Sequence, residues 1–404
     1  RYREIVEDLK PDVIVSFMPH HFKNVVYALK DFNIPVIVSH HTEPDYYCYN
    51  PQANSQNEIG LRLKSVKMSA LSTVLIDEFV DFFPEELRPK TIVTPNCVRE
   101  TNRDFTSETE RQTGVKTILN VARVAEEKNQ ELLLRAFALI KDKYPDWVVK
   151  IFGPDYTNFS PKVESLIKEL KLENQVFLMG VAKDIFSEFE KSQIFAFPSI
   201  SEGWPLALAE SMTFGLPNLV IKECLPTRVH VERGNCGFAV ANEPADYAKH
   251  LEILMNEPQL RKSLGKNGQE YVKQFHPHNI FTMWENLLRE ISKVENDKKM
   301  NIVLTTYSLC NITGGVERVV VDVANEMHLK GHKVSIINDQ INITKDDVPF
   351  FDLIPEIPIY NIHPFVNPVK KIVAKINNGL CTPDFQSDID EETGHHKKAV
   401  ILEQ

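Results

Sequence analysis

Two acidic residues, Glu202 and Glu210, flank an apolar run in the stretch SEGWPLALAE (residues 201–210). The preceding QIFAFPSI is typical of a buried strand, and the proline at 205 suits the first position of a helix because its missing N–H would be unpaired there. We therefore expect Glu202 in a loop at the carboxyl end of a strand and Glu210 inside the following helix. Ligands bind at that rim of open parallel sheets. Each acid alone is typical of a solvated surface charge, but together they are interpreted as binding hydroxyl groups.

Short β-branched segments alternate with helical patterns over most of the chain, which predicts parallel sheets covered by helices. The first group of expected strands lies before the polar stretch 99–114, which is interpreted as a linker. The second group lies between 116 and 221, and 258–295 is helical in pattern. The expected strands are 12–17, 34–40, 72–77, 90–96, 116–122, 148–152, 175–178, 193–197 and 217–221.

From Met300 the pattern resembles the start of a domain, with a strand, a glycine loop, a helix and a strand. Residues 1–110, by contrast, open as if in the middle of one. We predict that 300–404 and 1–110 are the first and second halves of one α/β domain. Residues 111–299 would form the other, with its closing helix. Circular permutation, or excision from a tandem protein, would give this order.

The glycines of that loop, Gly314 and Gly315, allow close backbone approach where a helix begins. Free N–H groups at a helix N-terminus attract phosphate or carboxylate. A plain tight turn is the other interpretation of the pair.

Composition limits the classes of function. The 404 residues are 43% hydrophobic and 25% charged, with a formal net charge of −10. An acidic surface without a strong basic patch argues against a nucleic-acid partner. No apolar run is long enough to span a bilayer, and the six cysteines show neither close pairs nor metal-ligand spacing. The expected setting is reduced and cytoplasmic.

Four segments together resemble family 4 retaining glycosyltransferases of the GT-B fold. SISEGWPLALAESMTFGLP (199–217) resembles the E-x7-E signature, and NVARVAEEKNQELLLRAF (120–137) is similar to the G-R-L-x-x-x-K-G segment, with Ala122 and Asn129 in place of its glycines. TGGVERVVVDVANEMHLKGHKVSI (313–336) resembles the amino-terminal loop and first helix. VIVSHHTEP (36–44) resembles the S-x-H-x-x-P segment. The resemblance implies two Rossmann-like α/β domains that face each other across a cleft.

The resemblance also implies transfer of a sugar from a nucleoside-diphosphate sugar, with UDP the expected nucleotide. A departing diphosphate needs cations and N–H groups aimed at it. Arg123 offers a planar fork for its oxygens and Lys128 a point charge, although each alone would be a solvated loop cation. Glu202 would bind hydroxyls of the transferred sugar, and Glu210 the ribose. His41 would face the sugar, while a buried structural histidine is the alternative and adjacent His40 leaves the register open.

The implied catalytic residues are therefore Glu202, His41, Arg123 and Lys128. Backbone N–H groups of 204–208 would bind phosphate. The implied donor-binding residues are Arg123, Lys128, Glu202, Gly203, Trp204, Pro205, Leu206, Glu210, Gly314 and Gly315.

Neither a cofactor nor a metal is expected, because the adjacent histidine pairs diverge on strands and the acidic DID (388–390) lies in a polar segment. The expected acceptor is a glycan or a lipid-linked sugar in surface polysaccharide biosynthesis. Peripheral contact of 367–376 with the inner face of a membrane is an option. Two alternatives stay open: a GT-B relative that binds a sugar nucleotide without transferring it or that epimerises the sugar, and a fragment of two fused transferases.

Overall fold

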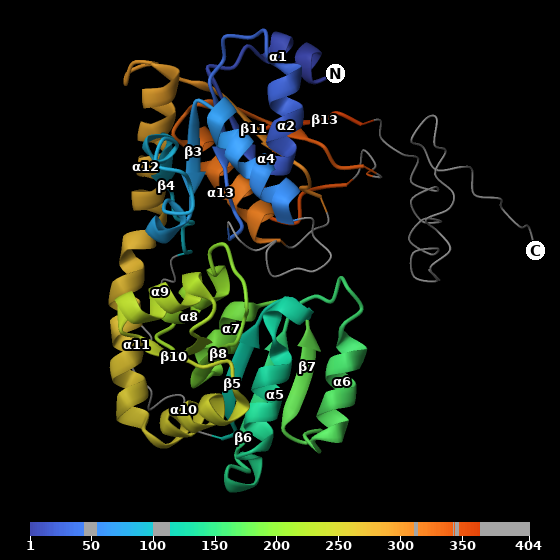
Figure 1. Cartoon of the computed structure of the whole chain (residues 1–404), viewed down its shortest axis with the longest axis vertical. Coiled ribbons are helices and arrows are strands. Elements are labelled where there is room, and N and C mark those ends of the chain that lie inside the picture. Colours follow the sequence, from blue (N-terminus) through green and yellow to red (C-terminus); the bar gives the residue numbers. More distant parts are fainter. Residues whose placement is uncertain (44–54, 100–113, 311–313, 342, 344–346, 364–404) are drawn as a thin grey trace, which may run out of the picture.

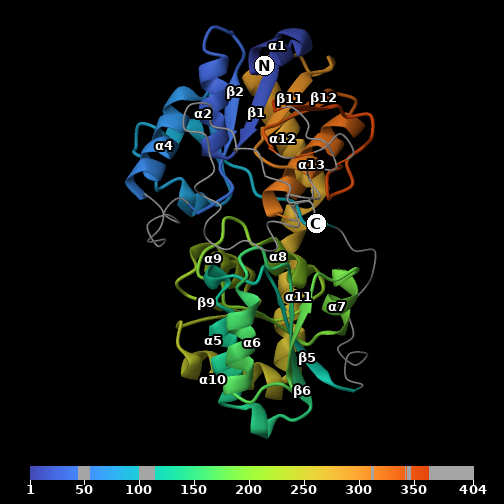
Figure 2. The same cartoon turned by 90° about the vertical axis from the view of Figure 1, so that its right-hand side faces the viewer.

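The computed structural model describes residues 1–43, 55–99, 114–310, 314–341, 343 and 347–363. These residues form two lobes, each built on one parallel sheet, stacked along the long axis of the molecule (Figure 1; Figure 2). The expected linker 99–114 and the segments 367–376 and 388–390 lie almost entirely outside the described residues.

The first lobe combines both ends of the described chain. Its sheet has the order β13-β12-β11-β1-β2-β3-β4. β1 pairs with β11 in parallel, with Val13 opposite Ile302, so the strands expected at 12–17 and near 302 share one sheet. The strands are β1 (Val13–Phe17), β2 (Val36–Ser39), β3 (Leu71–Val74), β4 (Thr91–Val93), β11 (Asn301–Thr306), β12 (Lys333–Asn338) and β13 (Ile359–Asn361).

The helices of this lobe pack their apolar residues on a sheet whose central strands are buried on both faces. Such continuous apolar strands are expected where helices cover a parallel sheet on two sides. The helices are α1 (Tyr2–Leu9), α2 (Pro19–Ala28), α4 (Ser55–Met68) and α13 (Gly315–Leu329), with short 3-10 turns at η1 (Asp77–Phe79) and η2 (Arg88–Lys90).

The second lobe has a sheet of order β10-β9-β8-β5-β6-β7. Its strands are β5 (Lys116–Val121), β6 (Trp147–Phe152), β7 (Val176–Gly180), β8 (Ile194–Phe197), β9 (Asn218–Ile221) and β10 (Gly237–Val240), the last missed by the sequence pattern. Its helices are α5 (Gln130–Ala138), α6 (Ser160–Glu169), α7 (Ile185–Lys191), α8 (Leu206–Thr213), α9 (Leu225–Gly234), α10 (Pro244–Asn256) and α11 (Pro258–Val272), with 3-10 turns at η4 (Glu126–Lys128), η5 (Lys141–Lys143) and η6 (Lys273–Phe275).

A final helix, α12 (Pro277–Ser292), returns to the first lobe. The helical pattern expected over 258–295 is divided between α11 and α12, since His276 is extended and Pro277 starts a new helix. The Trp284 ring of α12 lies 6.3 Å from the ring of Phe17 on β1. The aromatics of this segment therefore form a packing face.

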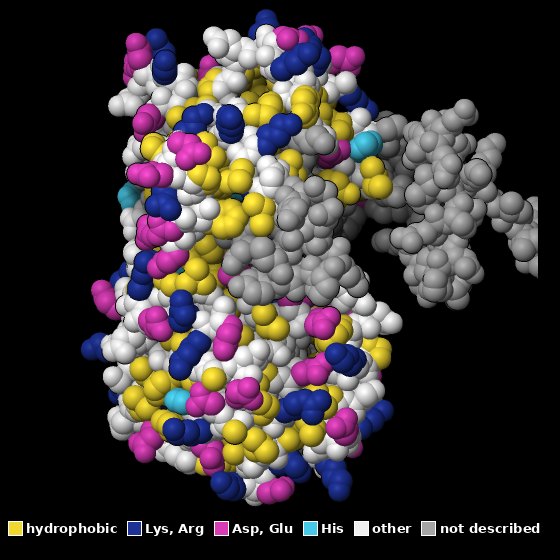
Figure 3. Space-filling model, viewed as in Figure 1, with side chains coloured by type: hydrophobic (Ala, Val, Ile, Leu, Met, Phe, Trp, Pro, Cys, Tyr) yellow, Lys and Arg dark blue, Asp and Glu magenta, His cyan; other side chains and the backbone are white. Residues whose placement is uncertain are grey.

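Charged side chains of both signs are scattered over both lobes on the face seen in Figure 3. No helix among the described residues combines the length and the apolar character that crossing a bilayer requires.

Candidate active site

The acidic stretch lies where the sequence placed it, between β8 and α8. Glu202 is in the loop, and α8 begins at Leu206 with Pro205 as its cap, one residue later than predicted. The helix ends before Gly215, whose φ of 65° is the left-handed conformation that favours glycine. Parallel β8 lies inside the sheet, so its carboxyl end delivers the loop to the rim that faces the first lobe.

Glu202 is held by two donors from its own lobe. Lys128 Nζ lies 2.8 Å and Ser199 Oγ 2.7 Å from the same oxygen, Oε1. The Lys128 and Glu202 side chains are only 11% and 14% exposed, so the ion pair is largely shielded from water. Both donors bind Oε1, and this fixes the orientation of the carboxylate. No described residue donates a hydrogen bond to Oε2.

Local backbone geometry brings Lys128 to this place. Lys128 ends the η4 turn, and the next residue, Asn129, has a φ of 51°. Glycine and asparagine are the residues that tolerate this conformation most readily. Asn129 therefore supports the turn, at the position where the segment it resembles has a glycine.

Arg123 lies at the mouth of the same site. Its side chain is 45% exposed and makes one ion pair, from Nη2 to Glu127 Oε1 at 2.9 Å. A guanidinium carries five N–H donors, so most of its hydrogen-bonding capacity faces outward.

His41 reaches the site from the first lobe, just beyond β2. Its Nε2 lies 2.9 Å from Ser39 Oγ, and burial lowers the pKa of its imidazole to about 3. The ring is therefore neutral at physiological pH. His40 packs against Phe83, with ring centroids 5.7 Å apart, and His41 is the histidine that lines the cavity described below.

Gly203 lies tightly against the backbone of the first lobe. A Cβ atom at this position would lie 2.1 Å from the backbone oxygen of His41. Only a residue without a side chain allows this approach. The loop that carries Glu202 therefore packs directly on the segment that carries His41.

The glycine loop of the first lobe lies opposite α8. Gly314 caps α13, and a Cβ there would collide with the Glu317 carboxylate, which is hydrogen-bonded to Ser308. Gly315 opens the helix, and a Cβ there would lie 3.4 Å from Leu206. The loop residues 311–313 lie outside the described residues.

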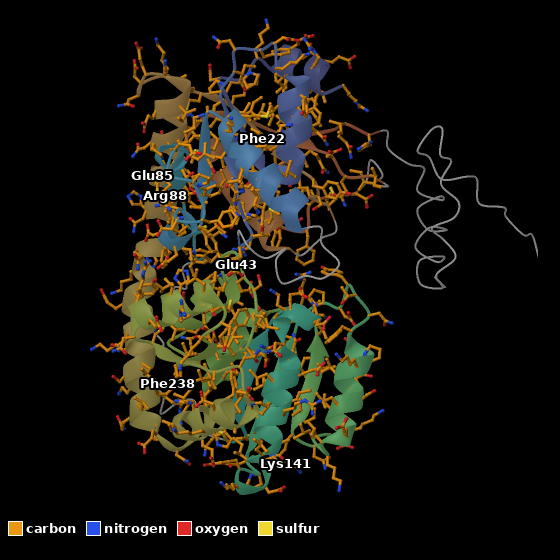
Figure 4. The ribbon with its side chains drawn as sticks, in the orientation of Figure 1. Phe22, Glu43, Glu85, Arg88, Lys141 and Phe238 are labelled. Carbon is orange, nitrogen blue, oxygen red and sulfur yellow. The ribbon has the colours of Figure 1, made fainter. Side chains whose placement is uncertain are left out.

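One cavity of about 340 Å³ joins these parts. Glu43 lies at the junction of the two lobes (Figure 4). Its Oε2 accepts a hydrogen bond from Ser201 Oγ at 2.7 Å, from one lobe to the other. The cavity-lining residues are His41, Thr42, Glu43, Asn96, Arg123, Glu127, Lys128, Ser201, Glu202, Gly203, Trp204, Leu206, Gly315 and Val316.

Three of the predicted donor-binding residues, Pro205, Glu210 and Gly314, do not line this cavity. Glu210 points instead to the first lobe, where its Oε1 lies 2.5 Å from Arg318 Nη1.

Residues 204–206 also differ from the prediction that their backbone N–H groups bind phosphate. Pro205 has no N–H, and the Leu206 N–H bonds to Trp204 O at 2.9 Å, so neither is a free phosphate donor here. The Trp204 ring makes edge contacts with His230 and Phe275, at 5.2 and 5.3 Å. This packing anchors the loop.

Sequence reasoning missed Glu43, Ser199, Ser201 and Arg318. Glu43 had a usable signal, because it follows His41 by two residues at the carboxyl end of a parallel strand. Arg318 had none, since its position depends on how the two lobes meet. Within the described part of the chain, no group of three His, Cys, Asp or Glu side chains could hold a metal ion.

Residues 102–271 match the family model of the glycosyl transferases group 1. The matched segment contains Arg123, Lys128, Glu202 and Glu210. Outside it lie the first-lobe residues of the site.

Similarity to solved structures extends over both lobes. Anabaena HepE in complex with UDP and glucose has a TM-score of 0.61 and 18% identity, covering 72% of this chain and 81% of that chain. The pneumococcal O-GlcNAc transferase GtfA in complex with UDP and GlcNAc has a TM-score of 0.59 and 18% identity, covering 72% and 59%. The predicted GT-B fold is confirmed.

The chain is also similar to curated glycosyltransferases. An uncharacterized glycosyltransferase of Haemophilus influenzae is 26% identical over 293 residues, 71% of this chain and 79% of the relative. The Campylobacter jejuni protein named "GalNAc-alpha-(1->4)-GalNAc-alpha-(1->3)-diNAcBac-PP-undecaprenol alpha-1,4-N-acetyl-D-galactosaminyltransferase" is 24% identical over 294 residues, 72% of this chain and 77% of the relative.

A second C. jejuni protein, an "N-acetylgalactosamine-N,N'-diacetylbacillosaminyl-diphospho-undecaprenol 4-alpha-N-acetylgalactosaminyltransferase", is 37% identical over 162 residues. The match covers 40% of this chain and 43% of that protein. Taken together, the comparisons support a glycosyltransferase.

Proposed function

We propose that this protein is a retaining, metal-independent hexosyltransferase. It would move a sugar from a nucleoside-diphosphate sugar, with UDP as the nucleotide, to a glycan or lipid-linked acceptor in surface polysaccharide biosynthesis. The cavity between the lobes carries this proposal, because cations, acids and a neutral histidine from both lobes converge on it.

In the proposed reaction, the diphosphate lies against Arg123 and Lys128. Arg123 is accessible and has unused donors, so it suits the outer phosphate oxygens. Lys128 is buried beside Glu202 and supplies charge where the bond to the sugar breaks. Cations positioned in advance stabilise the negative charge that develops on a leaving diphosphate.

Glu202 suits hydroxyl recognition better than nucleophilic attack. Its Oε1 is held by Ser199 and by Lys128, whose positive charge balances that of the carboxylate, and Oε2 is left to accept from a sugar hydroxyl. The bond between the anomeric carbon and the diphosphate oxygen breaks, and its electron pair stays on the diphosphate. The acceptor hydroxyl then forms the new bond on the same face and gives its proton to a phosphate oxygen, so the anomeric configuration is retained.

The chemistry of relatives supports the choice of substrates. Both C. jejuni relatives are named for acceptors that carry an undecaprenol group and for N-acetylgalactosamine transfer. HepE and GtfA were both crystallised with UDP. We therefore propose a saccharide linked to undecaprenyl diphosphate as the first acceptor to test.

The test compares wild type with Glu202→Gln and Glu202→Ala. UDP affinity is measured by calorimetry, and UDP release is followed with UDP-glucose, UDP-GlcNAc and UDP-GalNAc. We expect each variant to lose at least about 100-fold in turnover while the dissociation constant for UDP changes by less than about threefold, since Glu202 contacts the sugar and not the nucleotide. Glu202→Gln keeps the shape of the side chain. Comparing it with Glu202→Ala therefore separates the loss of the carboxylate charge from the effect of leaving Lys128 without a neighbouring oxygen.

Two results would reject the proposal. Turnover that survives both substitutions would remove Glu202 from the site. A wild-type protein that binds UDP but transfers none of the three sugars to the lipid-linked saccharide would favour a non-transferring sugar-nucleotide binder. The anomeric proton coupling of the product, measured by NMR, tests retention.

A further inference from the structure

An ion pair links the lobes at a residue of the proposed donor site. Arg318 lies in the first turn of α13 in the first lobe, and Glu210 lies on α8 in the second. Arg318 Nη1 is 2.5 Å from Glu210 Oε1, and the two side chains are 11% and 8% exposed. A pair this well shielded fixes both groups more firmly than a surface pair, and removing one partner leaves a costly unpaired charge.

The remaining surroundings of Arg318 keep it charged. Burial lowers the pKa of its guanidinium, but the charge and hydrogen bond of Glu210 together with the charge of Asp322 raise it, and the net shift of the pKa is upward. Asp322, one turn further along α13, lies 3.7 Å from Arg318 Nε. Arg99 lies 3.9 Å from the other oxygen of Asp322. The cluster is thus balanced in charge, with Arg318 at its centre.

Only one carboxylate oxygen of Glu210 takes part in this ion pair. Arg318 takes Oε1, and no described residue donates a hydrogen bond to Oε2. A carboxylate oxygen can accept more than one hydrogen bond. Oε2 of Glu210 is therefore left in a fixed orientation, one turn of α8 after Leu206, which lines the cavity.

We propose that Arg318 is a positioning residue: from the opposite lobe it holds Glu210 in the orientation that binds the ribose of the donor. Nucleotide binding is then strongest when the lobes are closed. This inference rests on the proposed nucleoside-diphosphate donor and on the ribose-binding role that the family resemblance implies for Glu210. Arg318 itself contacts no substrate.

A second ion pair between the lobes provides a matched control. Arg233 on α9 lies 2.8 Å from Glu78 and 3.3 Å from Asp77 of η1, and its side chain is 45% exposed. Exposed pairs contribute little to stability, and Arg233 does not line the cavity. It therefore links the same two lobes without touching Glu210.

The experiment uses the full chain with Arg318→Met, Arg318→Lys and Arg233→Met. Calorimetry gives the dissociation constant for UDP, and UDP release from UDP-sugar gives kcat and KM. We expect Arg318→Met to raise the UDP dissociation constant and the donor KM at least about tenfold, with a smaller effect on kcat. Arg318→Lys restores part of the affinity, and Arg233→Met stays within about twofold of wild type.

A double variant separates positioning from general destabilisation. If Arg318 acts through Glu210, Arg318→Met has little further effect on UDP affinity in a Glu210→Gln background. Full additivity of the two effects would overturn the inference. So would UDP affinity in Arg318→Met equal to or higher than that of wild type.

Small-angle scattering of the protein without nucleotide tests the link between the lobes independently of the proposed donor. We expect a larger radius of gyration for Arg318→Met than for Arg233→Met, whereas equal radii for all variants would overturn the inference. If wild type binds no UDP, the proposed donor fails, and the scattering result still shows whether Arg318 holds the lobes together.

Discussion

At the scale of single residues, Glu43 is the acid that the motifs did not identify. It is buried on the first lobe, lines the cavity and accepts a hydrogen bond from Ser201 of the second lobe. In the proposed reaction Arg123, Lys128 and Glu202 bind the donor on the second lobe, so the acceptor would lie against the first lobe. Glu43 is therefore placed to bind an acceptor hydroxyl, while Glu202 binds the donor sugar.

We predict that Glu43→Gln raises the acceptor KM or lowers turnover at least about tenfold, because an amide oxygen is a weaker acceptor than a carboxylate. UDP affinity stays within about threefold, since the nucleotide lies on the other lobe. Steady-state UDP release and calorimetry measure the two effects. Glu85→Gln, an exposed acid on the outer surface of the same lobe (Figure 4), is the control. Equal kinetics for both variants would contradict the role of Glu43.

Residue-level prediction from the sequence succeeded where a residue's place follows from its own strand, loop and helix. Glu202, Lys128 and Arg123 line one cavity because each lies at the rim of the second-lobe sheet. Glu210 was placed correctly on α8, but its partner could not be predicted. Arg318 is more than 100 residues away in sequence and on the other lobe, and no local pattern encodes that contact.

At the scale of elements, the loop between β8 and α8 depends on a glycine for its contact with the other lobe. Gly203 lies against the backbone of His41, and its conformation is one that other residues can also adopt. A methyl group there would therefore act through sterics alone. It would push apart the segments that carry Glu202 and His41.

We predict that Gly203→Ala lowers kcat/KM at least about tenfold with a nearly unchanged melting temperature, since the strain is relieved by a shift of one lobe. The matched control is Gly60→Ala in α4, where an added Cβ meets nothing within 4 Å and helix propensity improves. Activity assays and thermal melts compare the two variants. Wild-type activity in Gly203→Ala would show that close approach of the lobes is not needed.

Glycine and proline stand at the boundaries of two helices. Gly215 ends α8, and Pro277 starts α12. β10 was missed because the segment Gly237–Val240 is short and has a glycine at its start. That glycine packs on β9, where a Cβ would collide with Asn218. Close packing of a neighbouring strand therefore makes the local sequence a poor strand signal.

At the scale of the whole molecule, the pairing of β1 with β11 joins residues almost 300 positions apart in one sheet. The sequence predicted it because each end of the chain looked like an incomplete domain. How the two lobes meet was not predictable in the same way. It depends on contacts such as those of Glu43 with Ser201 and Arg318 with Glu210, each between segments that are separately well formed.

His41 and His230 are buried, neutral histidines near the junction of the two lobes. They make the stability of the whole protein sensitive to acid. His41 lines the cavity, and His230 lies beneath the loop, where its Nδ1 is 2.9 Å from Tyr271 Oη and its ring contacts Trp204. Burial lowers the pKa of both imidazoles to about 3. An unfolded histidine has a pKa near 6.5, so the unfolded chain binds more protons between these values.

The free energy of unfolding therefore falls as the pH drops below about 6.5, and the loss continues towards about 3. At pH 5 each of these histidines costs about 2 kcal/mol relative to pH 8. Urea unfolding at a series of pH values measures the slope. His230→Gln cannot be protonated and is expected to show a shallower loss between pH 7 and pH 5, whereas a slope equal to that of wild type would mean that His230 does not stay neutral in the folded protein.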